Sequence, residues 1–346
     1  MTGSNKENLI IKKTDSLDVI LRALEKSISK VLFCVNKDNS LFGSITDGDI
    51  RRALLKYNTA ELSAEKICNK KSLHANEESI NSVLAKAKKK QIKAFPILKD
   101  KKISRIFYVN NLIPKKMPPV VIMAGGLGKR LGSITKDKPK PLVEISENLT
   151  IIDIIVNNLI AQGFKEMYFT LNYKASQIEE HLLKNYSDKV SLNFVIEKNK
   201  MGTAGSLFYL RDKLKGNFIL MNADIITNLN FEALINFHNK NRNLISVVAN
   251  KTSYQLSKGV IEYSGNRIKA IKEKPSIDYT YNAGIYIINA KCLKSLQEGY
   301  LDMPDLINNL ITTNKVRVFP LMEYWKDLGI IEDLEEAKKD LINGFK

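Results

Sequence analysis

The spacing of hydrophobic residues repeats in the first third of the chain. Apolar positions at helical spacing over 17–24 are followed by two short β runs, at 31–35 and 41–46, and the same order returns over 80–109. Apolar residues three or four positions apart predict an amphipathic helix, and short apolar runs between turn residues predict strands. The repeat therefore predicts two small α-β-β modules that pack on each other to bury their sheets.

A proline-rich stretch then separates this region from the rest of the chain. Pro114, Pro118 and Pro119 lie around two lysines, and such a stiff polar breaker predicts a domain boundary. We expect one domain over residues 1–115 and a second over 119–346. The length of 346 residues agrees with two domains of ordinary size.

Strands and helices alternate after this boundary. The apolar run at 120–123 predicts a strand buried on both faces, and Ser176 and Glu179 have the spacing of a capping box at a helix start. The alternation predicts an α/β fold with a doubly wound, mostly parallel, Rossmann-like sheet, in which ligands bind at the carboxyl ends of the strands. The other expected strands are 166–171, 192–197, 218–222 and 245–249, and the expected helices are 151–162, 176–184, 204–213 and 231–238.

Composition narrows the class of protein further. Hydrophobic residues make up 44% of the chain, yet no apolar run approaches the roughly 20 residues that cross a bilayer. The polar start lacks the apolar stretch of a secretion signal, so we expect a cytoplasmic protein without a membrane partner. Cys34, Cys68 and Cys292 lie far apart along the chain without metal-site spacing, which favours buried, reduced thiols.

The net charge raises nucleic-acid binding as a hypothesis. It is +17, from 54 basic and 37 acidic residues. The lysines are dispersed along the chain, however, without a basic stripe interleaved with aromatic residues. We therefore expect no nucleic-acid partner, and the charge favours small polyanionic substrates.

A glycine-rich segment follows the first strand of the second domain. Its sequence, AGGLGKRL, is followed by KPKPL. Gly125, Gly126 and Gly128 let the backbone approach a phosphate, whose oxygens successive N–H groups can hold. Arg130 adds a bidentate donor and Lys140 a point charge, and both suit a triphosphate. The segment is not a P-loop, because no Gly-Lys-Ser/Thr triplet follows.

These elements resemble the signature loop of the sugar-phosphate nucleotidyltransferases, which couple a nucleoside triphosphate to a sugar 1-phosphate. The resemblance runs from about residue 120 to residue 337. It implies that the glycine loop and Arg130 hold the triphosphate and that Lys140 stabilises charge at the α-phosphate. Together with Asp224 these two are the expected catalytic residues. Lys129 and Ser133 stand where Thr and Pro are common in the family, which leaves the charges in place.

A second matching segment is expected to bind the nucleobase. Glu197 and the run MGTAG at 201–205 follow a predicted strand, and the small residues around Gly202 and Thr203 leave room for a base. A carboxylate such as Glu197 can accept both N–H groups of a guanine edge, whereas uracil or thymine suits an amide better. The segment also resembles the base-binding segment of guanylyltransferases, which favours GTP, with UTP or dTTP as the alternative.

Two aspartates are candidate metal ligands. Asp224 follows the apolar strand at 218–222, and Asp327 lies in the run WKDLG. Two carboxylates, phosphate oxygens and water suit the octahedral coordination of Mg²⁺, which is the expected cofactor. The resemblance assigns both residues to the metal, although Ala223 stands where Gly is usual.

The sugar site is expected from two further matches. By resemblance, Glu273 binds sugar hydroxyls, Lys274 binds the sugar phosphate, Asn282 and Gly284 contact the ring, and Gly259 lets the sugar approach the backbone. These residue types do not separate mannose from a 2-amino sugar. The resemblance to CBS-fused members that serve bacterial legionaminic acid synthesis favours glucosamine 1-phosphate over mannose 1-phosphate.

The front repeats resemble a pair of CBS motifs. In the end of such a motif, Thr and Asp at this spacing contact ribose hydroxyls of adenine nucleotides, which makes Thr46 and Asp49 candidate ligands. The matching positions of the second copy, Arg105, Tyr108 and Asn111, depart from the pattern. A nucleotide sensor and a purely structural, dimer-forming pair both remain open, and a homodimer is expected.

The expected reaction is an in-line displacement by the sugar phosphate at the α-phosphorus of the nucleotide. It depends on positioning and on charge stabilisation rather than on a general base. A regulatory protein that responds to nucleotides, with an inactive transferase domain, is the hypothesis from another class.

Overall fold

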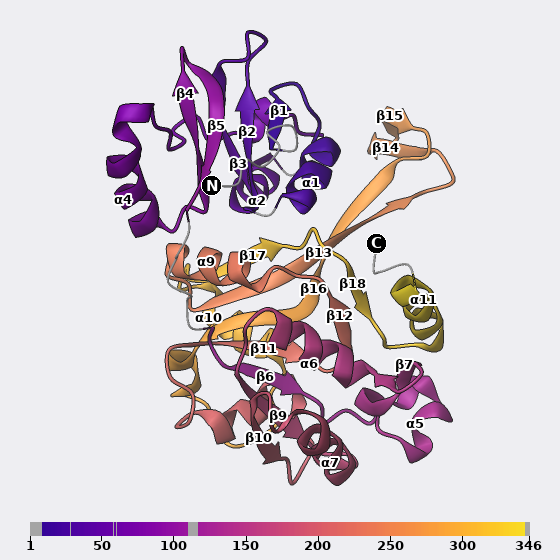
Figure 1. Cartoon of the computed structure of the whole chain (residues 1–346). Coiled ribbons are helices and arrows are strands. Elements are labelled where there is room, and N and C mark those ends of the chain that lie inside the picture. Colours follow the sequence, from indigo (N-terminus) through magenta and orange to yellow (C-terminus); the bar gives the residue numbers. More distant parts are fainter. Residues whose placement is uncertain (1–8, 28, 58, 60, 110–116, 343–346) are drawn as a thin grey trace. The chain divides into compact units, whose positions relative to one another are not determined.

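The computed structural model describes residues 9–27, 29–57, 59, 61–109 and 117–342. The chain forms two compact units, Met1–Lys116 and Met117–Lys346 (Figure 1). Within the described residues, no helix is long and apolar enough to cross a membrane.

The first unit contains two α-β-β modules, and the predicted order of elements is confirmed in both. The sheet β1-β2-β3 belongs to the first module and the hairpin β4-β5 to the second. The sheets meet at their edges, where the N–H of Leu41 donates to the carbonyl of Lys101 at 2.9 Å. The elements are β1 (Ile10–Lys12), α1 (Leu17–Lys26), β2 (Val31–Val35), β3 (Leu41–Thr46), α2 (Asp47–Tyr57), α3 (Ala64–Ile67), α4 (Ile80–Lys90), β4 (Ala94–Lys99) and β5 (Lys102–Tyr108).

Two cysteines that are distant in the sequence come together in this unit. Cys34 lies opposite Gly43 in the β2–β3 pair, and a Cβ atom placed on Gly43 would lie 2.6 Å from the Sγ of Cys68. A hydrogen bond from the Cys68 thiol lowers the pKa of Cys34. Cys34 and Cys292 are buried as expected, but Cys68 is partly exposed.

The second unit is built on a seven-stranded mixed sheet with the order β10-β9-β6-β11-β16-β13-β17. The first four strands are parallel, β16 runs antiparallel to both its neighbours, and β17 is parallel to β13. The sheet is therefore mostly parallel, as predicted. Its strands are β6 (Val120–Met123), β9 (Glu166–Leu171), β10 (Ser191–Ile196), β11 (Asn217–Asn222), β13 (Ile245–Gln255), β16 (Ser276–Asn289) and β17 (Val316–Pro320).

Both faces of this sheet are buried. Val120 and Ile122 of β6 belong to one apolar cluster, which also contains residues of α6 (Ile151–Ala161) and α7 (Ala175–Tyr186). Val121 belongs to the cluster on the other face, together with Leu207 and Leu210. Alternate strand residues point to opposite faces, so the continuous apolar run of β6 is what a double-sided core requires. The other helices of the unit are α5 (Ile134–Asp137), α8 (Gly202–Gly205), α9 (Phe231–Asn241), α10 (Met303–Ile311) and α11 (Ile331–Ile342).

Two helix predictions need correction. The capping box of Ser176 and Glu179 is wrong, because α7 begins at Ala175 after Lys174, whose side chain makes no capping hydrogen bond. The helix expected over 204–213 is instead α8 followed by the 3-10 turn Ser206–Leu210.

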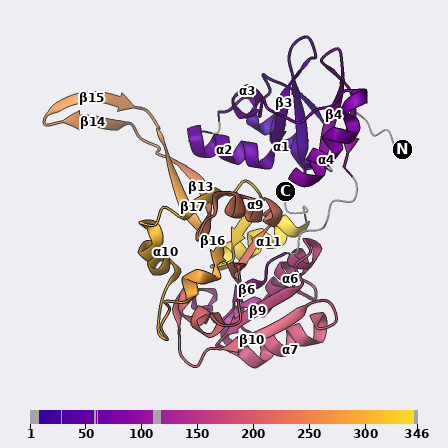
Figure 2. The same cartoon turned by 90° about the vertical axis from the view of Figure 1, so that its left-hand side faces the viewer.

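Strands β13 and β16 continue beyond the sheet as a two-stranded ribbon, with β14 (Val260–Ser264) and β15 (Arg267–Lys272) at its tip (Figures 1 and 2). The strand expected over 245–249 is thus only the first half of β13. Separate small pairs join β12 (Ile225–Thr227) to β18 (Trp325–Asp327) and β7 (Glu144–Ser146) to β8 (Leu149–Thr150).

Candidate active site

The centre of the candidate site is an ion pair between a lysine in a 3-10 turn and an aspartate that follows a strand. The Nζ of Lys140 lies 2.5 Å from the Oδ2 of Asp224, directly after β11. Lys140 is buried, with 8% of its surface exposed, in the 3-10 turn that follows the glycine loop. A buried lysine amine needs a partner of opposite charge, and Asp224 provides it.

The glycine loop folds tightly back on this turn. Gly128 has a φ of +64°, and a Cβ there would lie 2.9 Å from the Cγ2 of Thr135 and 3.2 Å from the Cβ of Lys140. The Thr135 hydroxyl donates to the Gly128 carbonyl at 3.0 Å. A side chain at this position would therefore force the loop away from Lys140, whereas Gly126 faces open space.

Asp327 reaches the same place from a distant segment. Asp327 pairs with Ile225 across β18 and β12, and the N–H of Leu328 donates to the Asp224 carbonyl at 2.9 Å. A Cβ on Gly329 would lie 3.2 Å both from an Nη atom of Arg130 and from the Oδ1 of Asp327. The structure thus brings both aspartates, Arg130 and Lys140 together.

The electrostatics of the two aspartates fit a cation site. Burial, followed by the charge of Asp224, raises the pKa of Asp327, while Lys140 and Arg130 oppose this rise. The Oδ1 atoms of Asp224 and Asp327 are both buried without a hydrogen-bond partner among the described residues. Buried carboxylate oxygens are costly when unpaired, and a bound cation would satisfy them. The described residues hold no group of three or more potential metal ligands, so phosphate and water would complete the coordination.

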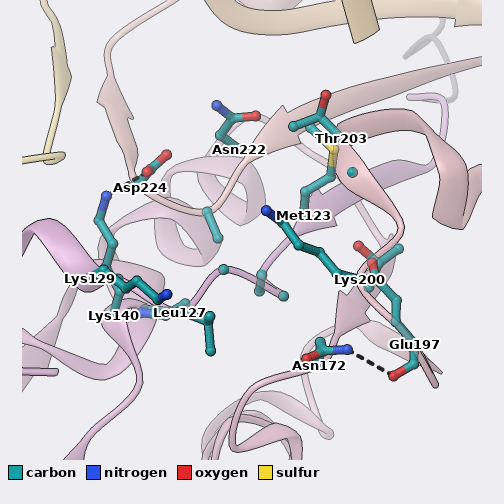
Figure 3. Close-up of a pocket in the computed structure, with 18 of the residues that line it drawn as sticks. Met123, Leu127, Lys129, Lys140, Asn172, Glu197, Lys200, Thr203, Asn222 and Asp224 are labelled. Carbon is teal, nitrogen blue, oxygen red and sulfur yellow. Dashed lines mark hydrogen bonds and ion pairs between the residues drawn. The ribbon is translucent and has the colours of Figure 1, made fainter. Parts of the chain in front are cut away.

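Glu197 lies at the other end of the loop. Its N–H donates to the Leu171 carbonyl at 2.7 Å, and its own carbonyl accepts from the Asn172 side chain at 3.0 Å (Figure 3). A Cβ on Gly125 would lie 3.4 Å from the Oε2 of Glu197. Burial raises the pKa of this carboxyl, although neighbouring polar groups such as Ser206 oppose the rise. It is therefore not a solvated strand-end carboxylate.

The segment after Glu197 is joined to a loop that the sequence did not indicate. Gly202 has a φ of +74°, and a Cβ there would lie 2.5 Å from the Leu301 carbonyl oxygen. The N–H and hydroxyl of Thr203 donate to the Oδ1 of Asp302 at 3.0 and 3.1 Å. These bonds fix α8 and its short side chains beside the glycine loop.

Together these elements line a cavity of about 590 Å³. Figure 3 shows Lys129, Lys140 and Asp224 on one side of it, and Asn172, Glu197 and Lys200 on the other. The predicted residues that line it are Gly125, Gly126, Gly128, Arg130, Lys140, Glu197, Gly202, Thr203 and Asp224.

A second cavity, of about 310 Å³, shares Thr203, Asn222 and Asp302 with the first. Asn282, Gly284 and Asp327 also line it. Trp325 lines it too, and its indole N–H donates to the Ala283 carbonyl at 2.9 Å. Gly284 has a φ of +68°, and a Cβ there would lie 2.5 Å from Ile225.

Three predicted sugar-site residues lie elsewhere. Gly259, Glu273 and Lys274 are exposed on the ribbon and line neither of these two cavities. The structure brings them to one another, since a Cβ on Gly259 would lie 2.9 Å from the Oε2 of Glu273. It does not bring them to Asn282 and Gly284.

Some lining residues were missed by the sequence analysis. Asn172 and Asn222 lie at the ends of β9 and β11, where the rule for parallel strands could have indicated them. Tyr300, Asp302 and Trp325 come from loops and a short strand after β16. No local pattern around them differs from an ordinary turn.

The candidate ligands of the first unit are bonded to each other. The Oδ2 of Asp49 accepts from the N–H of Thr46 at 2.9 Å and from its hydroxyl at 2.6 Å. Arg52 pairs with the other oxygen of Asp49. In the second module Arg105 pairs with Glu77 at 2.8 Å, while Asn111 lies outside the described residues.

The fold is that of an α/β protein, and the glycine-lined cavity with Arg130 and Lys140 lies at the carboxyl ends of its parallel strands, where such folds bind ligands. Residues 119–344 match the family model described as Nucleotidyl transferase, and the chain belongs to this family.

Part of the chain is also similar to curated proteins and to solved structures. It is 32% identical over 224 residues to a mannose-1-phosphate guanyltransferase of Yarrowia lipolytica, covering 62% of the chain and 61% of the relative. A mannose-1-phosphate guanyltransferase of Hypocrea jecorina is 30% identical over 225 residues, with the same coverage. The chain thus spans about three fifths of the length of these relatives. The crystal structure of HddC from Yersinia pseudotuberculosis complexed with GMP-PN has a TM-score of 0.51 and 24% identity, covering 65% of this chain and all of that one, and shows the shared fold.

Proposed function

We propose that the chain transfers a nucleotidyl group from a nucleoside triphosphate to a sugar 1-phosphate. The observation that carries this proposal is the convergence of Lys140, Arg130 and two incompletely bonded aspartates beside a glycine loop. Membership of the nucleotidyl transferase family supports the reaction class, and the names of the similar proteins support a sugar 1-phosphate as acceptor.

The reaction is a displacement at the α-phosphorus. A phosphate oxygen of the sugar 1-phosphate forms the new P–O bond, and the bond to the bridging oxygen of the β-phosphate breaks. Pyrophosphate leaves with that electron pair. The attacking oxygen is already anionic at pH 7, so the reaction needs no base, and catalysis consists of positioning and neutralisation of charge.

The residues of the first cavity divide this work. Lys140 is held in place by Asp224 and presents its charge where the glycine loop turns. The guanidinium of Arg130 and the carboxylate of Asp327 both lie next to Gly329. The backbone at Gly126 faces open space, which leaves room for phosphate oxygens. Asp224 and Asp327 would hold Mg²⁺, which when bound supplies charge stabilisation to the phosphates.

We favour GTP as the nucleotide. Glu197 is buried next to Gly125 at the end of the cavity remote from Asp224, where its carboxylate can accept from a guanine edge. The guanyltransferase relatives support this choice. A uridylyl- or thymidylyltransferase remains the second candidate, because Asn172 provides an amide at the same end.

Glucosamine 1-phosphate is the favoured acceptor, followed by mannose 1-phosphate. The second cavity is lined by the carboxylate of Asp302, whose charge favours a cationic 2-amino group over a neutral hydroxyl, while Asp327 is assigned to the metal. The names of the relatives favour mannose. Only a direct comparison of the two acceptors separates them.

For the first unit we propose a CBS pair that supports a homodimer. Its repeated α-β-β modules support this assignment. Thr46 and Asp49 already satisfy each other and Arg52, which supports a structural role over binding of an adenine nucleotide.

Pyrophosphate release tests the proposal. The full chain is incubated with Mg²⁺, each nucleoside triphosphate and a panel of sugar 1-phosphates. Release with GTP and glucosamine 1-phosphate is expected, and Glu197→Gln should lower the preference for GTP over UTP by about 10- to 100-fold, as expected for loss of a paired base contact. Release with another pair would overturn the specificity. No release with any pair, with or without AMP or ATP, would favour the regulatory hypothesis.

A further inference from the structure

The residues around Asp327 alternate between two surroundings. Trp325 and Asp327 line the second cavity. Lys326, which lies between them, and Tyr324, directly before β18, bond to helix α11 instead. Successive residues of a strand point to opposite sides, so one short segment faces the cavity with one set of side chains and α11 with the other. The position of the Asp327 carboxylate is therefore tied to the contacts of its neighbours with α11.

The contacts with α11 form one polar cluster. The Nζ of Lys326 lies 2.6 Å from the Oε2 of Glu336 and 3.3 Å from the Oδ2 of Asp340. The same Oδ2 atom accepts from the hydroxyl of Tyr324 at 2.8 Å. The Lys326 side chain is only 17% exposed, so water and salt screen its ion pairs less than pairs on the open surface. We use the name α11 anchor for Tyr324, Lys326, Glu336 and Asp340.

Strand β18 needs support because its own pairing is short. It is three residues long and pairs with β12 in a ladder separate from the seven-stranded sheet. A two-stranded ladder is at best marginally stable in water by itself. Helix α11 lies beside β18 (Figure 1), and Leu334 of the helix is buried in the same apolar cluster as Ile225 and Leu328. The helix therefore supports this segment by apolar packing as well as by the α11 anchor.

Electrostatic repulsion acts against the position of Asp327. The charge of Asp224 lies close enough to raise the pKa of Asp327, after the larger effect of burial. The Oδ1 atoms of both aspartates are buried without a hydrogen-bond partner among the described residues. Two buried carboxylates repel each other as long as no cation lies between them. Asp224 follows β11, which lies between β6 and β16 in the sheet, so the repulsion should displace the short strand β18 rather than β11.

Resting on the proposed function, we propose that Lys326 is a positioning residue of the metal site. Through Glu336 and Asp340 it holds β18 against the repulsion between the two aspartates, and Asp327 stays beside Asp224 before a cation binds. Without the α11 anchor, Asp327 is displaced in part of the molecules. The apparent affinity for a cation then falls in proportion to the fraction of molecules in which the site is formed. A saturating cation restores the site in all of them.

Binding of Mn²⁺ alone to the full chain tests this role without catalysis. Mn²⁺ takes the same oxygen ligands as Mg²⁺, and electron paramagnetic resonance measures its free concentration. Lys326→Met removes the amine but keeps most of the apolar side chain, and it should weaken Mn²⁺ binding about three- to tenfold. Lys338→Met is the matched control, because Lys338 lies on α11 and pairs with Glu335 at 2.7 Å. Equal affinities in the two variants would overturn the proposal.

Asp327→Asn identifies the Mn²⁺ that belongs to this site. Only the binding that is lost in this variant is compared between Lys326→Met and Lys338→Met. If the wild-type chain has no Mn²⁺ binding that depends on Asp327, the metal site and the positioning role are both wrong.

A conservative variant tests whether the ion pairs themselves are responsible. Lys326→Arg keeps a positive charge that can reach Glu336 and Asp340, and its Mn²⁺ affinity should stay within about twofold of the wild-type value. An affinity as low as that of Lys326→Met would show that the ion pairs do not position Asp327.

Steady-state kinetics separate positioning from a loss of folded protein. In Lys326→Met the Mg²⁺ concentration for half-maximal pyrophosphate release should rise about three- to tenfold, while kcat at saturating Mg²⁺ stays within about twofold. A lower kcat with an unchanged Mg²⁺ dependence would mean that the variant is only less stable, and would overturn the proposal. If the chain has no transferase activity but Lys326→Met weakens the binding of Mn²⁺ that depends on Asp327, the positioning role stands and the proposed function is rejected.

Hydrogen exchange follows the position of β18 directly. The N–H of Leu328 donates to the Asp224 carbonyl at 2.9 Å, so it exchanges when this segment moves away from Asp224. In the metal-free chain this amide should exchange about three- to tenfold faster in Lys326→Met than in the wild type, and at the wild-type rate in Lys338→Met. The same rate in both variants would show that the α11 anchor does not hold β18.

Discussion

Asp49 in the first unit and Asp224 in the second both follow a strand, yet their surroundings differ. Both oxygens of Asp49 are bonded, one to Thr46 and the other to Arg52. Asp224 shares one oxygen with Lys140 and keeps the other buried without a partner among the described residues. Both oxygens of Asp49 are therefore occupied by contacts within the fold, whereas the Oδ1 of Asp224 can still bind a ligand. Unsatisfied oxygens therefore indicate function better than the position of the aspartate along a strand.

The largest expected effect comes from removing the charge of Asp224. Asp224→Asn should reduce kcat by about 1,000-fold, because it removes a proposed metal ligand and frees the Lys140 ammonium, and charge stabilisation of this kind is worth about 3 to 4 kcal/mol. Asp49→Asn is the matched control and should keep kcat within about twofold. Steady-state pyrophosphate release measures both, and circular dichroism checks the fold. Similar losses of kcat in the two variants would show that Asp49 and Asp224 do not differ in function.

The acidic limb of the pH profile gives a smaller effect. Burial and Asp224 raise the pKa of Asp327, whose ionised form is the one that can hold a cation. At subsaturating Mg²⁺, kcat/KM should therefore fall about tenfold per pH unit below that raised pKa, which lies above the usual value of about 3.9. The ionised carboxyl is disfavoured in the folded chain, so the metal-free protein should gain stability as the pH falls through the same range.

Asp327→Asn tests both parts of this prediction. The variant should have a higher Tm in EDTA than the wild type. The fall of its kcat/KM at acidic pH that is due to Asp327 should disappear. A lower Tm in EDTA would show that Asp327 stabilises the fold rather than straining it.

The smallest expected effect is on stability. Asp49→Ala removes the acceptor for the Thr46 N–H at the start of α2 and should lower the free energy of unfolding of the first unit by about 1 kcal/mol. Urea unfolding of the full chain, followed by hydrogen exchange in α2, measures this loss. Full stability together with a loss of nucleotide response would assign Asp49 to ligand binding instead.

Much of the second unit could be predicted because its strands are buried on both faces. A continuous apolar run such as Val120–Met123 indicates a strand that is buried on both faces. The residues that follow such strands lie at the carboxyl ends of the parallel sheet. Asp224 and Glu197 were found in this way. Local patterns also gave the two α-β-β modules of the first unit.

Long-range contacts could not be predicted from local patterns. Asp302 enters the first cavity only because Thr203 and the Leu301 carbonyl hold its loop, and nothing in the loop sequence encodes that partner. Ser176 and Glu179 have the spacing of a capping box, yet the helix is capped at Lys174, two residues before Ser176. The ribbon is a third case. The sequence distance between Glu273 and Gly284 is short, but in an extended strand it becomes a long separation in space.

The pairing of β12 with β18 affects when the candidate site can form during synthesis on the ribosome. Ile225 is paired with Asp327, and the Asp224 carbonyl accepts from the N–H of Leu328, so the two halves of the proposed metal site lie about a hundred residues apart in the sequence. Contacts between such distant segments form late, because the chain between them must first be ordered. A nascent chain that has not yet emerged as far as residue 327 holds Asp224 and Lys140 but no second carboxylate. If the proposed function is right, incomplete chains are expected to be inactive until β18 has been added to the site.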